Sequence, residues 1–137
     1  YVNSFDILSL KKISESSLKP KCYAGGIREL EQAKSIIEVG FERVTLRTLF
    51  FKNINEYRNI IKLLGRQSVS LCLDIKKYQN SYFITIDDNR LFNLNDFIIH
   101  DKDLPGEIFI NYIDLNGCLS SLDMELINLT VLTTQNL

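Results

Sequence analysis

The fold of this chain is decided by one stretch, Gln67-Ser68-Val69-Ser70-Leu71-Cys72-Leu73-Asp74-Ile75-Lys76-Lys77. Its apolar and small residues follow one another without the spacing of an amphipathic helix. Such a continuous run is typical of a strand that is buried on both faces of a parallel sheet. The run ends at a carboxylate, Asp74, and the carboxyl ends of parallel strands are where open sheets and α/β barrels bind ligands. Asp74 is therefore a candidate for chemistry, and the alternative is that it only begins a turn.

The segments before this stretch alternate between helical and extended patterns. Apolar residues at helical spacing indicate helices, and short apolar or alternating runs indicate strands. The expected elements are a helix at 4–16, a strand at 21–24, a helix at 28–38, a strand at 43–47 and a third helix that ends at residue 64. Asn53 or Asn55 would cap the third helix, and Gly40 and Gly65 would end the second and third helices. This order predicts βαβ units and a parallel sheet.

The alternation breaks after residue 77. We expect a hairpin arm at 82–86 that runs back along 74–76, a polar turn at 87–90 and one short helix at 95–100. A second buried strand at 107–113 ends again at a carboxylate, Asp114. Asn116-Gly117 indicates a turn, and Asp123 would cap a last helix that runs to about residue 132.

The composition favours one globular domain. The chain has 137 residues, of which 45% are hydrophobic, and its 16 basic and 17 acidic residues nearly cancel. The sequence has no basic stripe of the kind that would predict nucleic acid or an anionic membrane surface as a partner. It also has no apolar run long enough to cross a bilayer. Because the chain begins with Tyr1 and its only methionine is Met124, we expect a processed chain or a piece of a longer one.

The cysteines argue against a metal or redox site. Cys22, Cys72 and Cys118 are odd in number and widely spaced, and none forms a CxxC pair. We expect Cys22 and Cys72 to act as small hydrophobic residues inside strands. Unpaired cysteines fit a reducing cytoplasm. We expect no cofactor and no metal.

Three predicted strand ends carry residues that can contact a ligand. One strand ends at Gly25-Gly26, and two others end at Asp74 and Asp114. In a barrel or an open sheet such ends converge on one rim. The glycine pair precedes a helix, so bare backbone amides could hold a phosphate there. The alternative is an ordinary tight turn between a strand and a helix.

Four segments, in colinear order, resemble the histidine-biosynthesis barrels. Cys22 to Ala33 resembles their third strand and loop, Arg43 to Thr48 their fourth strand, Gly65 to Lys77 their fifth, and Gly106 to Ile127 their sixth strand and its helix. The nearest members are the cyclase subunits of imidazole glycerol phosphate synthase. The resemblance covers nearly the whole chain except about residues 78 to 104.

The resemblance implies a partial (β/α)8 TIM barrel of the α/β class. A complete barrel of this type usually has about 250 residues, and this chain has about half of that. We expect strands three to six with their helices, and a hairpin after strand five. Strands one, two, seven and eight would be absent. Residues 1–137 would then form a single incomplete domain, the middle half of the barrel.

The resemblance also implies site residues. Asp74 matches the acid/base aspartate of strand five, whereas the partner aspartate of strand one has no counterpart. One substrate phosphate would bind at Gly26 and Thr48, next to Gly25, and Asp114 matches a second carboxylate on strand six. The family also docks a glutaminase subunit, and ammonia then passes a ring of charged residues along the barrel axis.

Arg43 and Glu107 match two members of this ring. The alternative is that both are ordinary charges at strand starts. In the family, ammonia and a bis-phosphorylated ribulosyl-imidazole carboxamide give imidazole glycerol phosphate and aminoimidazole carboxamide ribotide. We expect no such turnover from this chain by itself.

Two other functions stay open. One is a paralogue that supplies ammonia for sugar amidation in surface-polysaccharide synthesis. The other is a non-catalytic, truncated barrel, whose open sheet edges would lead to dimers or poor solubility.

Arg47 stands where the family has an active-site asparagine, so we also assign it to the substrate site. Neighbouring strands lie about 4.8 Å apart, and we expect Arg47 to pair with Asp74. A paired arginine favours the ionised carboxylate, which makes a worse general acid. The alternative is that Arg47 faces solvent or a substrate phosphate. In a complete barrel, Arg47→Asn should raise the cyclase rate, and an unchanged rate would contradict this role.

Overall fold

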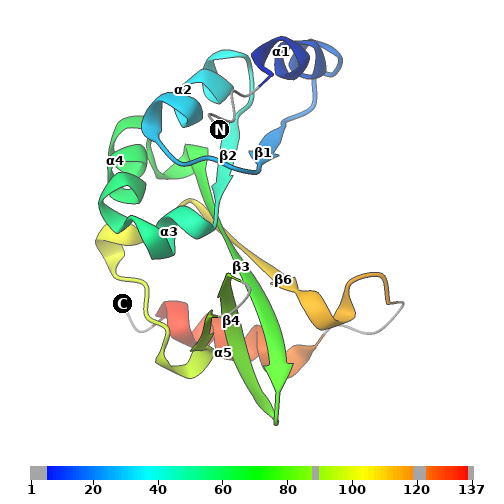
Figure 1. Ribbon diagram of the computed structural model, residues 1–137, viewed down its shortest axis with the longest axis vertical. Coiled ribbons are helices and arrows are strands. Elements are labelled where there is room, and N and C mark those ends of the chain that lie inside the picture. The colour runs from blue at the N-terminus through cyan, green and yellow to red at the C-terminus, as the bar shows by residue number, and fades with distance from the viewer. Residues whose placement is uncertain (1–5, 88–89, 119–122, 136–137) are drawn as a thin grey trace. The chain divides into compact units, whose positions relative to one another are not determined.

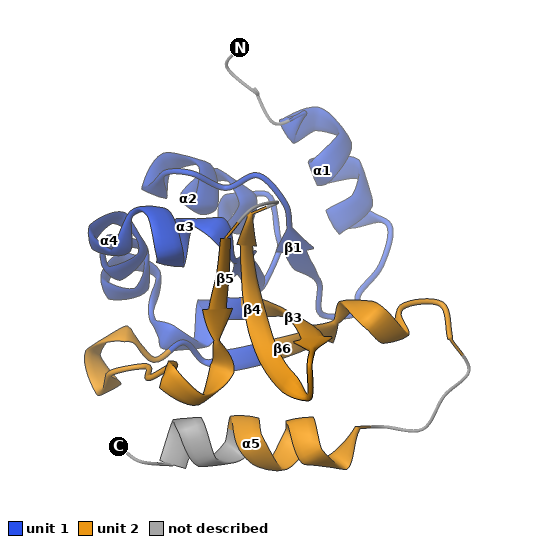
Figure 2. Ribbon diagram, turned by 60° about the horizontal axis from the view of Figure 1, so that its bottom comes forward, with its two compact units in different colours: residues 1–71, 105–108 blue, residues 72–104, 109–137 orange. Residues whose placement is uncertain are grey.

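The computed structural model describes residues 6–87, 90–118 and 123–135 (Figure 1). The chain divides into two compact units (Figure 2). The first unit holds residues 1–71 and 105–108, and the second holds 72–104 and 109–137. The strands pair in the order β1-β2-β3-β4-β5, and β6 also pairs with β3.

The first unit alternates helices and parallel strands. Its elements are α1 (Ile7–Glu15), β1 (Cys22–Ala24), α2 (Leu30–Glu38), β2 (Arg43–Leu46), α3 (Thr48–Lys52), α4 (Ile54–Leu64), a 3-10 turn at Arg66–Ser68 and the start of β3 (Val69–Tyr78). Strand β2 lies parallel to β1 on one side and to the first residues of β3 on the other. The predicted βαβ order of this half is confirmed.

The core of the first unit lies between the helices and one face of the strands. In β2, Val44 and Leu46 are buried while Arg43 and Thr45 on the opposite face are not, as the period of two requires. The buried partners from the helices and from β3 are Ala33, Ile36, Leu49, Tyr57, Ile60, Ile61, Val69 and Leu71.

Helix α4 begins and ends at the predicted residues. The side chain of Asn53 accepts a hydrogen bond from the amide of Glu56 at 3.1 Å, and so caps the helix. Gly65 follows the last turn with a φ of 83°, a left-handed conformation that glycine adopts readily. The separate helix α3, directly before Asn53, was not predicted.

The second unit is built on an antiparallel ribbon. It holds the rest of β3, then β4 (Ser81–Asp87), β5 (Arg90–Asn93), two 3-10 turns at Leu94–Asp96 and Asp101–Asp103, most of β6 (Glu107–Tyr112), a third 3-10 turn at Ile113–Leu115, and α5 (Met124–Gln135). Ile75 lies opposite Ile84 and Lys77 opposite Tyr82, which confirms the predicted hairpin. Its two-residue turn, Gln79-Asn80, has positive φ values at both positions, as tight hairpins need.

Several predictions about the second half were wrong. Strand β3 does not end at Asp74 but continues to Tyr78, because β4 supplies hydrogen-bond partners for its backbone. The helix predicted at 95–100 is replaced by two separate 3-10 turns, and β5 was not predicted. Strand β6 is not buried: Phe109 is 46% and Ile110 37% exposed.

The remaining predictions have mixed outcomes. Cys22 and Cys72 lie in β1 and β3, as expected, but Cys22 is exposed and Cys72 only half-buried, so neither is a fully buried hydrophobic residue. Asp123 does cap α5, since its carboxylate accepts from the amide of Leu126 at 3.1 Å. Residues 4–5 of the first predicted helix and 88–89 of the predicted turn lie outside the described residues. No helix in the described ranges is long and apolar enough to cross a membrane. One domain over 1–137 stays a prediction.

Gly106 gives a test of packing in the first unit. Its amide donates to the carbonyl oxygens of Arg66 at 2.8 Å and Val69 at 2.9 Å. A Cβ at residue 106 would lie 2.6 Å from the oxygen of Arg66 and 3.0 Å from the Cα of Gln67. Gly106→Ala should therefore lower the free energy of unfolding by about 1–3 kcal/mol, measured by urea denaturation.

The matched control is Gly117→Asn. A Cβ there meets nothing within 4 Å, and asparagine tolerates a φ of 78° better than most residues. Equal stability of Gly106→Ala and the parent chain would contradict the close approach.

Candidate active site

Asp74 is a buried carboxylate that accepts hydrogen bonds from the side chains of Asn111 and Cys72. Only 7% of the residue is exposed. The amide Nδ2 of Asn111 donates to its Oδ1 at 2.8 Å, and the thiol of Cys72 donates to the same oxygen at 3.7 Å. A buried carboxylate needs such donors, because leaving it without them is costly.

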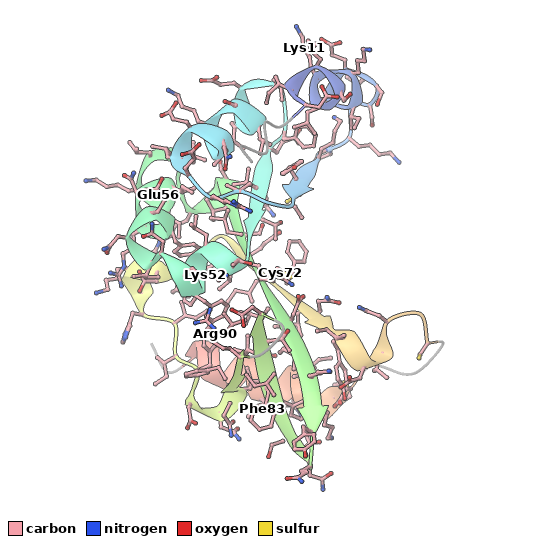
Figure 3. All side chains as sticks on the ribbon, viewed as in Figure 1. Lys11, Lys52, Glu56, Cys72, Phe83 and Arg90 are labelled. Carbon is pink, nitrogen blue, oxygen red and sulfur yellow. The ribbon has the colours of Figure 1, made fainter. Side chains whose placement is uncertain are left out.

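Two strands of the second unit bring these groups together. Cys72 and Asp74 are two residues apart on β3, so their side chains leave the same face of the strand. Asn111 comes from β6, which pairs with β3. The hydroxyl of Thr85, on β4, donates to the backbone oxygen of Asp74 at 3.2 Å. Figure 3 labels Cys72 on β3.

Asn111 was missed by the sequence analysis. A signal was present, because it is the amide side chain between Ile110 and Tyr112 in an otherwise apolar strand. A polar residue at such a position needs a partner inside the fold. The sequence could not identify this partner, since the two residues are 37 positions apart.

Asp114 holds the backbone of the hairpin. It is exposed and lies in the 3-10 turn that follows β6. Its Oδ2 accepts a hydrogen bond from the backbone amide of Lys77 at 2.7 Å. This contact joins the segment after β6 to β3, and a substrate-binding role for Asp114 stays a prediction.

A polar cluster in the second unit consists of Lys77, Tyr82, Asp123 and Glu125. The ammonium of Lys77 donates to the Tyr82 hydroxyl at 2.9 Å and to Glu125 at 3.0 Å, and it lies 4.6 Å from the centre of the Tyr82 ring. The Tyr82 hydroxyl lies 2.7 Å from Oδ2 of Asp123 and 3.1 Å from Oε2 of Glu125. These contacts attach the first turn of α5 to the hairpin.

The cluster shifts the pKa of each of its members. Burial, followed by the contacts with the two carboxylates, raises the pKa of Tyr82 to about 12. Hydrogen bonds to Tyr82 and Glu125 raise the pKa of Lys77. The hydroxyl of Tyr82 lowers the pKa of Asp123, and the ammonium of Lys77 lowers the pKa of Glu125. The arrangement is therefore that of a structural ion pair around a protonated tyrosine.

The predicted phosphate loop lies in the first unit. Gly25 and Gly26 have φ values of 145° and 60°, which other residues adopt rarely. Two of the amides that follow already have partners, however. The amide of Arg28 donates to the Gln32 side chain at 2.8 Å, and the amide of Leu30 donates to Glu56 at 2.7 Å.

Glu56 therefore changes the expectation of an anion at this helix start. Its carboxylate, on α4, stands at the first residue of α2 (Figure 3 labels Glu56). It already supplies the negative charge that a helix N-terminus favours. The amide of Leu30 is therefore not bare, and phosphate binding at Gly25 and Gly26 stays a prediction.

The other two predicted residues of the substrate site also lie in the first unit. Arg47 directly precedes α3, and Thr48 is the first residue of that helix. Their contact with a substrate stays a prediction. The pairing of Arg47 with Asp74 joins residues of the two units and stays a prediction as well.

Arg43 and Glu107 form an ion pair in the first unit. Both side chains are partly exposed, and the hydrogen bond to Glu107 raises the pKa of Arg43. Two residues that the sequence assigned to one charged ring are thus in direct contact. Their role in ammonia passage stays a prediction. Among the described residues, no group of three or more His, Cys, Asp and Glu side chains is arranged to hold a metal ion.

Comparison with known proteins gives a consistent result. Residues 4–135 match the family described as "Histidine biosynthesis protein". A Vibrio vulnificus protein named "Putative imidazole glycerol phosphate synthase subunit hisF3" is 32% identical over 129 residues, which is 90% of this chain and 50% of that protein. The imidazole glycerol phosphate synthase subunit HisF of Campylobacter concisus is 26% identical over 121 residues, 85% of this chain and 48% of that protein. The chain spans about half the length of these curated relatives.

The polar cluster predicts how stability depends on pH. The lowered pKa values of Asp123 and Glu125 contribute stability above their ordinary values, and this is lost as pH falls through the shifted ones. The raised pKa of Tyr82 contributes stability that is complete below its ordinary value of 10.0 and is lost as pH rises towards about 12. Thermal unfolding should therefore show a fall in melting temperature between about pH 10 and 12 that is smaller in Tyr82→Phe.

The control is Tyr78→Phe, at the end of β3 and 60% exposed. It should keep the alkaline profile of the parent chain. Identical profiles for Tyr82→Phe and the parent chain would contradict the role of the Tyr82 hydroxyl.

Proposed function

The chain belongs to the histidine biosynthesis protein family, and on this premise we propose that it carries part of the active site of an ammonia-dependent cyclase of the imidazole glycerol phosphate synthase type. Family membership and the mixed α/β sheet confirm the predicted fold class, a partial (β/α)8 barrel. The relatives support the family, and the reaction itself is the proposal.

Asp74 is the proposed acid/base residue. The observation that carries the proposal is its burial on β3 together with the 2.8 Å hydrogen bond from Asn111. Asp74 does not begin a turn, because β3 continues past it to Tyr78, and only 7% of the residue is exposed. Burial with defined donors is the usual setting of a carboxylate that exchanges protons with a substrate.

The reaction makes clear what a carboxylate would do. Ammonia nitrogen loses protons as it bonds to two carbons of the new imidazole ring, and the ketone oxygen of the substrate leaves as water. The departing aminoimidazole nitrogen, whose bond to the amidine carbon breaks, gains one proton. One carboxylate that accepts a proton and returns it can serve both steps. The product pair would be imidazole glycerol phosphate and aminoimidazole carboxamide ribotide, as the family resemblance implies.

The proposed partners follow from the same premise. A glutaminase subunit would supply ammonia, with Arg43 and Glu107 beside its path, and the substrate would be a phosphorylated small molecule held near Gly25, Gly26 and Thr48. No cofactor or metal is part of the proposal. The three cysteines, none of which belongs to a CxxC pair, fit the reducing cytoplasm that we propose as the location.

Two measurements test the function. The purified chain should show no ammonia-dependent turnover by itself. A completed barrel is then made by joining the full chain to the segments of the Campylobacter concisus relative that it does not match. Asp74→Asn in the completed barrel should lower kcat by about 10²–10⁴-fold, because general acid/base catalysis contributes that much.

The control variant is Asp96→Asn, an exposed carboxylate in the 3-10 turn after β5. It should leave kcat unchanged. Turnover by the isolated chain would overturn the first expectation. A completed barrel that is inactive, or insensitive to Asp74→Asn, would favour a non-catalytic protein.

A further inference from the structure

We propose that Asn111 is a positioning residue, whose side-chain amide fixes the orientation of the Asp74 carboxylate for proton transfer. This inference rests on the proposed function, because it assigns a role towards the proposed acid/base group. Asn111 would not touch the substrate in this role. It would act only through Asp74.

The contact has the geometry of a strong, directional hydrogen bond. The Nδ2–Oδ1 distance of 2.8 Å lies at the short end of the range for N–H donors. A donor to a carboxylate oxygen prefers to lie near the plane of that group, so the bond restricts rotation of the carboxylate. Because Asp74 is 7% exposed, little water is present to replace a lost donor.

Asn111 can restrict the Asp74 carboxylate because it lies on a different strand from Asp74. Cys72 also donates to Oδ1, but it lies on the same strand as Asp74, and its Sγ is 3.7 Å away. A thiol is a weak donor, and at this distance it constrains the carboxylate little. Asn111 reaches Asp74 from β6 and thus fixes the carboxylate relative to the neighbouring strand.

Orientation matters because proton transfer depends steeply on distance. A misplacement of about 1 Å can cost about 10²-fold in rate. A carboxylate on a strand can rotate about two side-chain bonds, and the hydrogen bond from Asn111 restricts this rotation. The proposal therefore separates two roles: Asp74 would exchange the proton, and Asn111 would hold Oδ1 of Asp74 towards β6.

The first experiment measures this orientation in the full chain. Three-bond couplings between the Hα and Hβ protons of Asp74 report χ1, the rotation about the Cα–Cβ bond that sets the direction in which the carboxylate leaves β3. We expect couplings of a single rotamer in the parent chain and in Cys72→Ala, and averaged couplings in Asn111→Leu, which keeps the shape of asparagine without its donor. Asn111→Ser, whose shorter hydroxyl cannot span the distance, should give the same averaging if the leucine variant does not fold.

The second experiment uses the completed barrel. Asn111→Leu and Asn111→Ser should lower kcat by up to about a hundredfold with little change in KM, because positioning is lost while substrate contacts remain. Cys72→Ala should stay within about twofold of the parent kcat, since a thiol is a weak donor.

The outcomes separate the two proposals. A severe loss in Asp74→Asn with parent-like kcat in both Asn111 variants would overturn the positioning role and leave the proposed function standing. Parent-like kcat in Asp74→Asn would overturn the proposed function, and the role of Asn111 in catalysis with it. Unchanged Asp74 couplings in a folded Asn111 variant would overturn the positioning role directly.

Discussion

Backbone hydrogen bonding along β3 is the constraint on which both units depend. The first residues of β3 pair in parallel with β2, and residues 75–78 pair antiparallel with β4. Every buried amide and carbonyl in such a strand needs a partner, so each part of β3 determines what can lie beside it. The parallel part requires crossover helices, whereas the antiparallel part needs only a tight turn. This difference explains why the alternation of helices and strands stops after residue 77 and a hairpin follows.

The position of Asp74 follows from the same strand. It lies beyond the residues that pair with β2 and directly before those that pair with β4. Alternation places Leu73 and Ile75 in the core, which turns Asp74 to the opposite face together with Cys72. A carboxylate fixed there by its strand needs a donor, and Asn111 supplies it. Burial and hydrogen bonding are thus two results of one strand register.

Several charged side chains in this protein hold separate segments of the chain together. Glu56 caps the start of α2, Asp114 holds the amide of Lys77, and Arg43 pairs with Glu107. Each of these joins segments that are distant in sequence but lie in the same unit. Gly106 contributes in another way, because its lack of a side chain lets the start of β6 lie close to the backbone that precedes β3. The family resemblance explains the order of the elements, and these contacts show how this chain holds them.

The sequence by itself determined the elements that depend on local patterns: the α/β alternation up to β3, a helix cap at Asn53 or Asn55, the hairpin after Lys77 and the family. Apolar spacing, caps and turns are encoded within a few residues, so they can be read directly. Only the tertiary structure decided that β3 continues past Asp74, that β6 is largely exposed, and which groups meet. The bond from Asn111 and the carboxylate of Glu56 at α2 each join residues 26 or more positions apart. No local pattern encodes such a meeting, because it results from how strands and helices pack.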